Sequence, residues 1–98
     1  MTEQNGPIAL SMTKKLDDAL QPERLEVINE SHLHAGHQDS FDGSGETHFR
    51  IRLVSPIFAG MPRIARHRMI NELLKDELSA SVHALAIEPA APGETVRW

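Results

Sequence analysis

The chain of 98 residues contains no cysteine and no tyrosine, and only one tryptophan and three phenylalanines. Without cysteine it can form neither a disulfide nor a nucleophilic thiolate. No apolar run approaches the roughly 20 residues that a membrane-spanning helix needs. The net charge of −4 argues against binding nucleic acid over the whole surface. The composition, 40% hydrophobic, indicates one small domain with a single core.

Signals for export and for catalysis are also missing. The first residues lack the basic and apolar segments of a secretory signal, which favours a cytoplasmic location. The sequence has no Gly-x-Ser-x-Gly motif around a nucleophile and no phosphate-binding glycine loop ahead of a helix. We therefore expect a protein that is not an enzyme.

Hydrophobic periodicity predicts five elements in the order helix, strand, strand, helix, strand. The expected helices cover residues 7–20 and 62–78, and the expected strands cover 25–29, 47–53 and 82–87. Within 47–53 apolar and polar residues alternate strictly, as in a strand with one buried face. The mostly apolar third strand is expected to be central or well covered and to end at Pro89. Residues 1–7 and 90–98 are expected to be tails around a domain at 8–89.

One face of the expected second helix carries both charged and apolar side chains. Arg63, Arg66 and His67 project onto the same face as the leucines that follow, and charged groups are not easily buried unpaired. The helix should therefore either overhang the sheet or break near residues 64–66. Both alternatives leave His67 at an exposed edge of the core.

The chain has six histidines, whose side chains can bind metal ions. His32, His34 and His37 share a glycine-containing segment between the first two strands, and His67 lies between two arginines. Imidazole is the commonest metal ligand, but a soft-metal site here would need sulfur from another molecule. The alternative is that these are solvated surface histidines. His48 is expected to be an exposed strand residue.

His83 is expected to be a buried core histidine, because it lies in an apolar run. A cluster of arginines could bind an anion, a phosphate backbone or an acidic protein surface, or could simply be solvated. No Gly-x-x-Gly clamp and no exposed aromatic platform supports nucleic-acid binding. The arginines of this cluster are Arg50, Arg52, Arg63, Arg66 and Arg68.

Several motifs resemble the BolA family in their order and spacing. Residues 58–60 read Phe-x-Gly, and 66–70 read Arg-His-Arg followed by two apolar residues. Segments 31–37 and 45–49 resemble the first hairpin of that family, and segment 82–86 resembles its last strand. The resemblance covers about residues 9–89. It implies a KH-like α+β fold, α-β-β-α(α)-β, with a three-stranded mixed sheet and the helices packed on one face.

The resemblance also implies a partner and a cofactor. BolA-like proteins pair with a monothiol glutaredoxin of the Cys-Gly-Phe-Ser type, and the pair holds a bridging [2Fe–2S] cluster. Glutaredoxin and glutathione would supply thiolate, and this chain would supply nitrogen from His67 and from His34 or His37, with His32 behind them. Phe58, Gly60, Arg66 and Arg68 would shape the surface facing the partner. The isolated chain is expected to hold no cofactor and to be a monomer or a weak homodimer.

The function expected from this resemblance is that of an adaptor in iron–sulfur cluster trafficking or in iron and redox regulation. Two alternatives stay open. One is a DNA-binding transcriptional regulator that uses the five arginines of the basic cluster. The other is a stand-alone histidine module that binds a metal ion without any partner.

Overall fold

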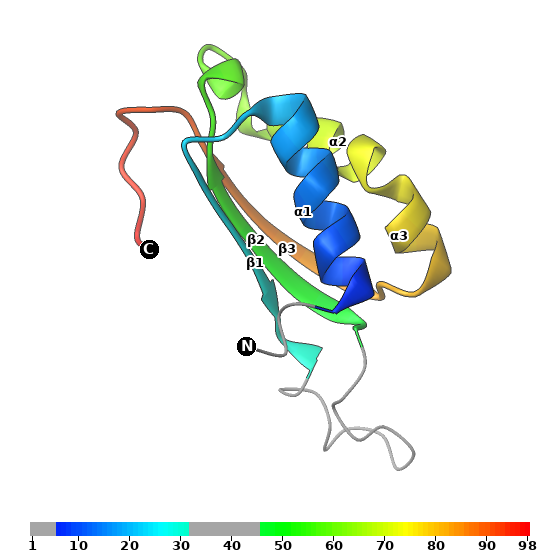
Figure 1. Ribbon diagram of the computed structural model, residues 1–98. Coiled ribbons are helices and arrows are strands. Elements are labelled where there is room, and N and C mark those ends of the chain that lie inside the picture. Colours follow the sequence, from blue (N-terminus) through cyan, green and yellow to red (C-terminus); the bar gives the residue numbers. More distant parts are fainter. Residues whose placement is uncertain (1–5, 32–45) are drawn as a thin grey trace.

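The computed structural model describes residues 6–31 and 46–98, and it has the predicted α+β architecture (Figure 1). Three strands form one sheet in the order β1-β2-β3, and the helices cover one of its faces. β1 is antiparallel to β2 and β3 is parallel to β2, so the predicted mixed sheet is confirmed. The elements are α1 (Pro7–Leu20), β1 (Arg24–Asn29), β2 (His48–Val54), the 3₁₀ helix η3 (Pro56–Phe58), α2 (Arg63–Leu73), α3 (Lys75–Ala80) and β3 (Ala84–Ala90).

The central strand is β2, and its predicted alternation is confirmed. Phe49, Ile51 and Leu53 are buried beneath the helices, whereas the residues between them lie on the uncovered face. β3 is an edge strand, so the prediction that it is central was wrong. Pro89 lies within β3 instead of ending it, which an edge strand tolerates because one side of its backbone needs no partner.

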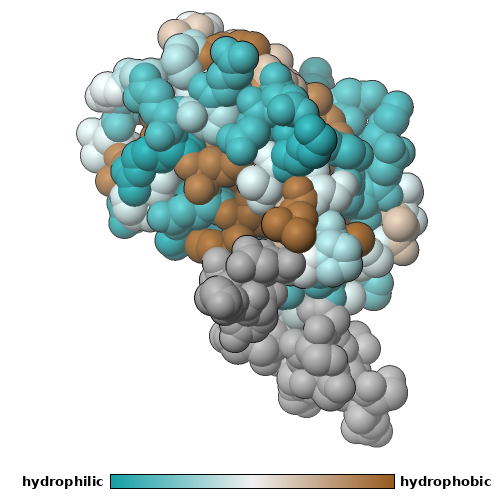
Figure 2. Space-filling model, viewed as in Figure 1, coloured by the Kyte–Doolittle hydropathy of each residue, from teal (hydrophilic) through white to brown (hydrophobic). Residues whose placement is uncertain are grey.

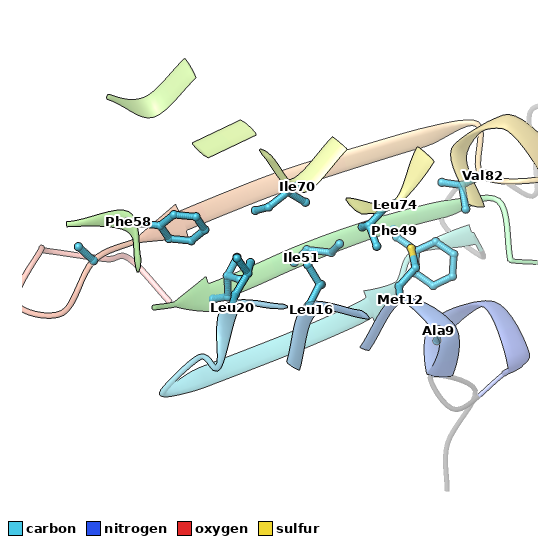
Figure 3. Packing of buried hydrophobic residues seen from close by; sticks show 12 residues of the cluster. Ala9, Met12, Leu16, Leu20, Phe49, Ile51, Phe58, Ile70, Leu74 and Val82 are labelled. Carbon is cyan, nitrogen blue, oxygen red and sulfur yellow. The ribbon is translucent and has the colours of Figure 1, made fainter. Parts of the chain in front are cut away.

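α1 packs one face against the sheet. Its buried side chains meet Phe49 and Ile51 of β2 and Ile70 and Leu74 of the second helical region (Figure 3). The residues that α1 contributes to the core are Ala9, Met12, Leu16 and Leu20.

The N-terminus of α1 is capped by a residue far away in the sequence. The amides of Ile8 and Ala9 donate to the two carboxylate oxygens of Glu46, at 3.0 and 2.9 Å. This acceptor satisfies amides that have no partner within the helix and places negative charge at the positive end of the helix dipole. A side chain on Gly6 would collide with Glu46, so the glycine permits this approach.

The second helical region is broken at Leu74, so a break near residues 64–66, one of the two predicted alternatives, was wrong. The expectation failed because Arg66 is buried with partners. Its guanidinium forms a two-pronged ion pair with Glu94, at 2.7 and 2.8 Å, and donates to the carbonyl of Met61 at 3.0 Å. A charge that is satisfied in this way can occupy the buried stripe of a continuous first turn.

α3 is fastened to α1 through a buried carboxylate, Glu77. The hydroxyl of Ser11 donates to one of its oxygens at 2.5 Å, and Lys15 donates to the other at 3.0 Å. Burial alone would raise the pKa of Glu77, but these two donors outweigh it and hold the pKa below its ordinary value. The pair therefore stays charged and joins the two helices.

The fold continues past the expected boundary at residue 89. Ala90 is the last residue of β3, and Ala91 joins the core. Glu94 accepts from Arg66 and from the amide of Ala91, and these bonds lower its pKa to about 2. The guanidinium carbon of Arg24 lies 4.6 Å from the ring centre of Trp98. Much of segment 90–98 is therefore attached to the domain.

The surface in Figure 2 is largely hydrophilic, with apolar patches between the polar side chains. Among the described residues, the large hydrophobic side chains that are exposed are Leu10, Ile57 and Ile64. No helix in residues 6–31 or 46–98 has the length and apolar character needed to cross a membrane.

Leu74→Ala should lower the free energy of unfolding by about 2–5 kcal/mol, because the leucine is fully buried and its loss leaves a cavity. The neighbouring Leu73 is only half-buried, so Leu73→Ala is the matched control and should cost less. Urea unfolding measures both. Equal losses for the two variants would contradict the packing described here.

Candidate metal centre

One end of the sheet gathers the two histidines of the described chain that lie closest in space. We call this group the loop root and define it as Ser31, Thr47, His48 and His83. Ser31 and Thr47 flank segment 32–45, which contains the three clustered histidines of the sequence. In Figure 1 the loop root lies at the lower end of the sheet, where β3 begins.

A fully buried serine ties the two sides of the loop root together. The hydroxyl oxygen of Ser31 accepts from the amides of Thr47 and His48, at 2.9 and 3.1 Å. The amide of Ser31 donates to the side-chain oxygen of Asn29 at 2.9 Å. The amide of Glu30 also donates to the carbonyl of His48, at 2.8 Å. These bonds fix the distance between the ends of β1 and β2.

The same backbone holds His83. The amide of His83 donates to the carbonyl oxygen of Thr47 at 2.7 Å, and the amide of Ala84 donates to that oxygen at 3.2 Å. His83 is exposed and precedes β3, so the prediction of a buried core histidine was wrong. Its ring centre lies 6.2 Å from that of His48, edge to face. His48 is half-buried, and its Nδ1 is 2.8 Å from the hydroxyl of Thr47.

His67 lies toward the opposite end of the sheet. Its neighbour Arg66 contacts the carbonyl of Pro89 and the side chain of Glu94, beyond the middle of β3. At about 3.3 Å per strand residue, the step from His83 to Pro89 spans roughly 20 Å. Figure 1 agrees, since α2 begins beside η3 at the upper end of the sheet. The structure therefore separates His67 from the loop root.

The other predicted ligands, His32, His34 and His37, lie outside the described residues. Within residues 6–31 and 46–98, no group of three or more histidine, aspartate or glutamate side chains is arranged to hold a metal ion. What this part of the chain offers near the loop root is a pair of imidazoles.

Only some residues of the predicted partner surface are exposed to solvent. Phe58 is fully buried and Arg66 is 8% exposed, so both side chains contribute to the fold. Gly60 is exposed and has φ +80°, a left-handed conformation that glycine adopts without strain in the turn before α2. Arg68 is exposed on α2. It borders an apolar groove whose other lining residues are Met61, Ala65, Met69, Asn71, Glu72 and Leu73.

Most of the predicted basic cluster is neutralised. Arg50 donates to Glu30 at 2.9 Å and to Glu88 at 2.5 Å, and these bonds raise its pKa. Arg52 lies 3.4 Å from Glu88 on the same uncovered sheet face and 3.6 Å from Glu26. Together with the buried Arg66, three of the five predicted arginines are thus engaged with carboxylates inside the protein.

Comparison with known proteins gives the family. A family model described as BolA-like protein matches residues 16–94. The chain belongs to the BolA family. A solved structure of the BolA domain of SufE1 from Arabidopsis thaliana superposes with a TM-score of 0.81 at 42% identity, covering 92% of this chain and 98% of that domain. The resemblance inferred from the sequence motifs is therefore confirmed.

Two relatives of the BolA-family chain bear on its size and function. A Sinorhizobium protein from the cobS 5′ region is 67% identical over 88 residues, which are 90% of this chain and 95% of that protein. A Vibrio cholerae protein named DNA-binding transcriptional regulator BolA is 50% identical over 74 residues. That match covers 76% of this chain and 65% of the Vibrio protein.

Ser31→Ala should lower the free energy of unfolding by about 1–3 kcal/mol, because it removes the acceptor of two amides. Ser79→Ala is the control, since Ser79 is exposed and its hydroxyl bonds only a local carbonyl, and it should change stability by less than about 0.5 kcal/mol. Chemical denaturation compares the two. A Ser31→Ala protein as stable as the Ser79→Ala protein would show that the loop root does not depend on this hydroxyl.

Proposed function

We propose that this chain is a non-enzymatic adaptor that supplies histidine nitrogen to a [2Fe–2S] cluster shared with a monothiol glutaredoxin and glutathione. Its role would lie in cluster trafficking or in iron and redox regulation. The observation that carries the proposal is the position of His83. Its imidazole is exposed, and its amide donates to the carbonyl of Thr47, next to the histidine-containing segment 32–45.

The donor set fits such a shared cluster. Iron in a [2Fe–2S] cluster accepts thiolate and imidazole ligands. This chain has no cysteine, so any thiolate must come from a partner, while its histidines can provide nitrogen. Imidazole in place of thiolate raises the reduction potential of such clusters and makes ligation sensitive to pH. Both properties suit a cluster that is sensed or passed on.

We assign the ligand role to His83 in place of His67, with His34 or His37 as the second ligand. His34 is three residues beyond Ser31, and an extended chain covers at most about 11 Å over that length. For His34 that reach favours a partner at the loop root over one roughly 20 Å along the sheet, whereas His37, six residues beyond Ser31, could extend about 22 Å. Sequence alone does not rank His34 above His37, so both are kept.

The test is an anaerobic titration of a cluster-loaded glutaredoxin homodimer, with glutathione present, followed by visible absorption and circular dichroism. The unmodified chain should produce a new spectrum that saturates at one chain per cluster. His83→Asn should abolish or strongly weaken this change, because the cluster loses one nitrogen ligand.

His67→Asn is the matched comparison, since it removes an imidazole at the other end of the sheet. It should give the same spectrum as the unmodified chain. Loss of the spectrum in the His67 variant with retention in the His83 variant would reverse the assignment. No complex with the unmodified chain would remove the adaptor function itself.

DNA binding is the second candidate, and the name of the Vibrio relative favours it. In this chain, Arg63 and Arg68 are the exposed members of the predicted basic cluster, both on α2. Affinity carried by few phosphate contacts should fall only shallowly with salt. A steep salt dependence together with a sequence preference would support a regulator instead of an adaptor.

A further inference from the structure

The apolar groove that Arg68 borders lies along α2 and has a volume of about 730 Å³. We call it the α2 groove. We propose that it binds a second protein through an amphipathic helix whose polar edge carries aspartate or glutamate. The proposal does not rest on the shared cluster, because α2 begins at the upper end of the sheet and the loop root lies at the lower end (Figure 1).

The apolar side chains of the α2 groove have the spacing of a helix stripe. Met61 precedes α2, and Ala65, Met69 and Leu73 follow it at intervals of four residues. From Ala65 to Leu73 the helix rises about 12 Å, which is slightly more than two turns. A helix that lies in a groove contacts it through side chains at positions i, i+3 or i+4, and i+7. The stripe therefore matches such a helix in length.

The lining side chains can adapt to a partner. Met61, Met69 and Leu73 pack against the core but are only partly buried, so part of each remains accessible. Methionine is flexible and polarizable, and it is common at surfaces that bind helices. Ala65 is small, which lets another backbone approach closely. Ile64, one turn before Arg68, is 64% exposed and adds apolar surface beside the groove.

The charge at the border of the groove indicates an acidic partner. Glu72 also lines the groove, but its carboxylate is paired with Lys75 at 3.2 Å. Arg68 is exposed, and no carboxylate in residues 6–31 or 46–98 forms an ion pair with it. The uncompensated charge of the border is therefore positive. An aspartate or glutamate beside the apolar face of a bound helix would complement it.

The same groove suits nucleic acid less well. DNA is held mainly through phosphate contacts from cations and hydrogen-bond donors, and these do not need a lining of methionine and leucine. Burial of apolar surface, in contrast, stabilises the packing of a helix in a groove. The combination of an apolar lining with one free arginine therefore favours a protein helix.

The experiment uses the full chain without glutaredoxin and a fluorescein-labelled synthetic peptide of about 14 residues. The peptide is a designed helix with leucines along one face and glutamates beside them, and the control peptide has lysine in place of every glutamate. Fluorescence anisotropy measures both. We expect saturable binding of the glutamate peptide at one peptide per chain, and an affinity about tenfold lower for the lysine peptide.

Arg68→Glu should reverse this preference, because the border then carries negative charge. Lys14→Glu is the matched control, since it makes the same change of charge at an exposed position on α1, and it should keep the preference for the glutamate peptide. Met69→Glu should weaken the glutamate peptide about tenfold or more, because it places a charge in the apolar lining. Circular dichroism checks folding, and Arg68→Glu decides the test if Met69→Glu lowers stability.

Four results would overturn the inference. The first is that neither peptide binds, and the second is that both bind with equal affinity. The third is a preference that Arg68→Glu and Lys14→Glu change alike. The fourth is self-association of the chain alone that Met69→Glu abolishes in sedimentation velocity, which would show that a second copy occupies the groove. These measurements leave the cluster proposal untouched, because no glutaredoxin or cluster is present.

Discussion

The amide and the carbonyl of Thr47 both form hydrogen bonds with other parts of the chain, and the structure at the lower end of the domain depends on these bonds. The amide of Thr47 donates to the buried hydroxyl of Ser31, which ends the β1 side of the sheet. Its carbonyl accepts from the two amides at the start of β3. The preceding residue, Glu46, caps α1. A stretch of two residues therefore joins a helix and three strands at one place.

This arrangement gives the two ends of the sheet different characters. At the lower end, polar hydrogen bonds hold the loop root in place and leave the imidazole of His83 exposed. At the upper end, Arg66 and Glu94 fasten α2 and the C-terminal segment together. In this pair the positive charge of Arg66 stabilises the fold.

The helices and strands were predicted well because the residue patterns that indicate them involve only neighbouring residues. The alternation from His48 to Leu53 and the apolar spacing in α1 need no knowledge of distant residues. The errors came from long-range partners. Glu46 caps a helix that begins 39 residues earlier, and Arg66 is buried because of an acid 28 residues later.

The site was harder to predict for the same reason. His83 was taken for a core residue because Val82 and Ala84 flank it, but strand order and register place it at an open end of an edge strand. His67 was favoured by the Arg-His-Arg motif, although one of those arginines serves the core. Residue spacing in the sequence does not give the distance between the two ends of a strand, so the sequence alone could not place His67 and the loop root at different ends of the sheet.

The most direct measurement is pulsed electron paramagnetic resonance on the reduced glutaredoxin heterocomplex, with this chain labelled by ¹⁵N-histidine. The account predicts hyperfine coupling from two histidine nitrogens in the unmodified chain and in His67→Asn, and no such pair of couplings in His83→Asn. Two couplings that survive in His83→Asn, or one that vanishes in His67→Asn, would contradict the assignment of the cluster ligand to the loop root.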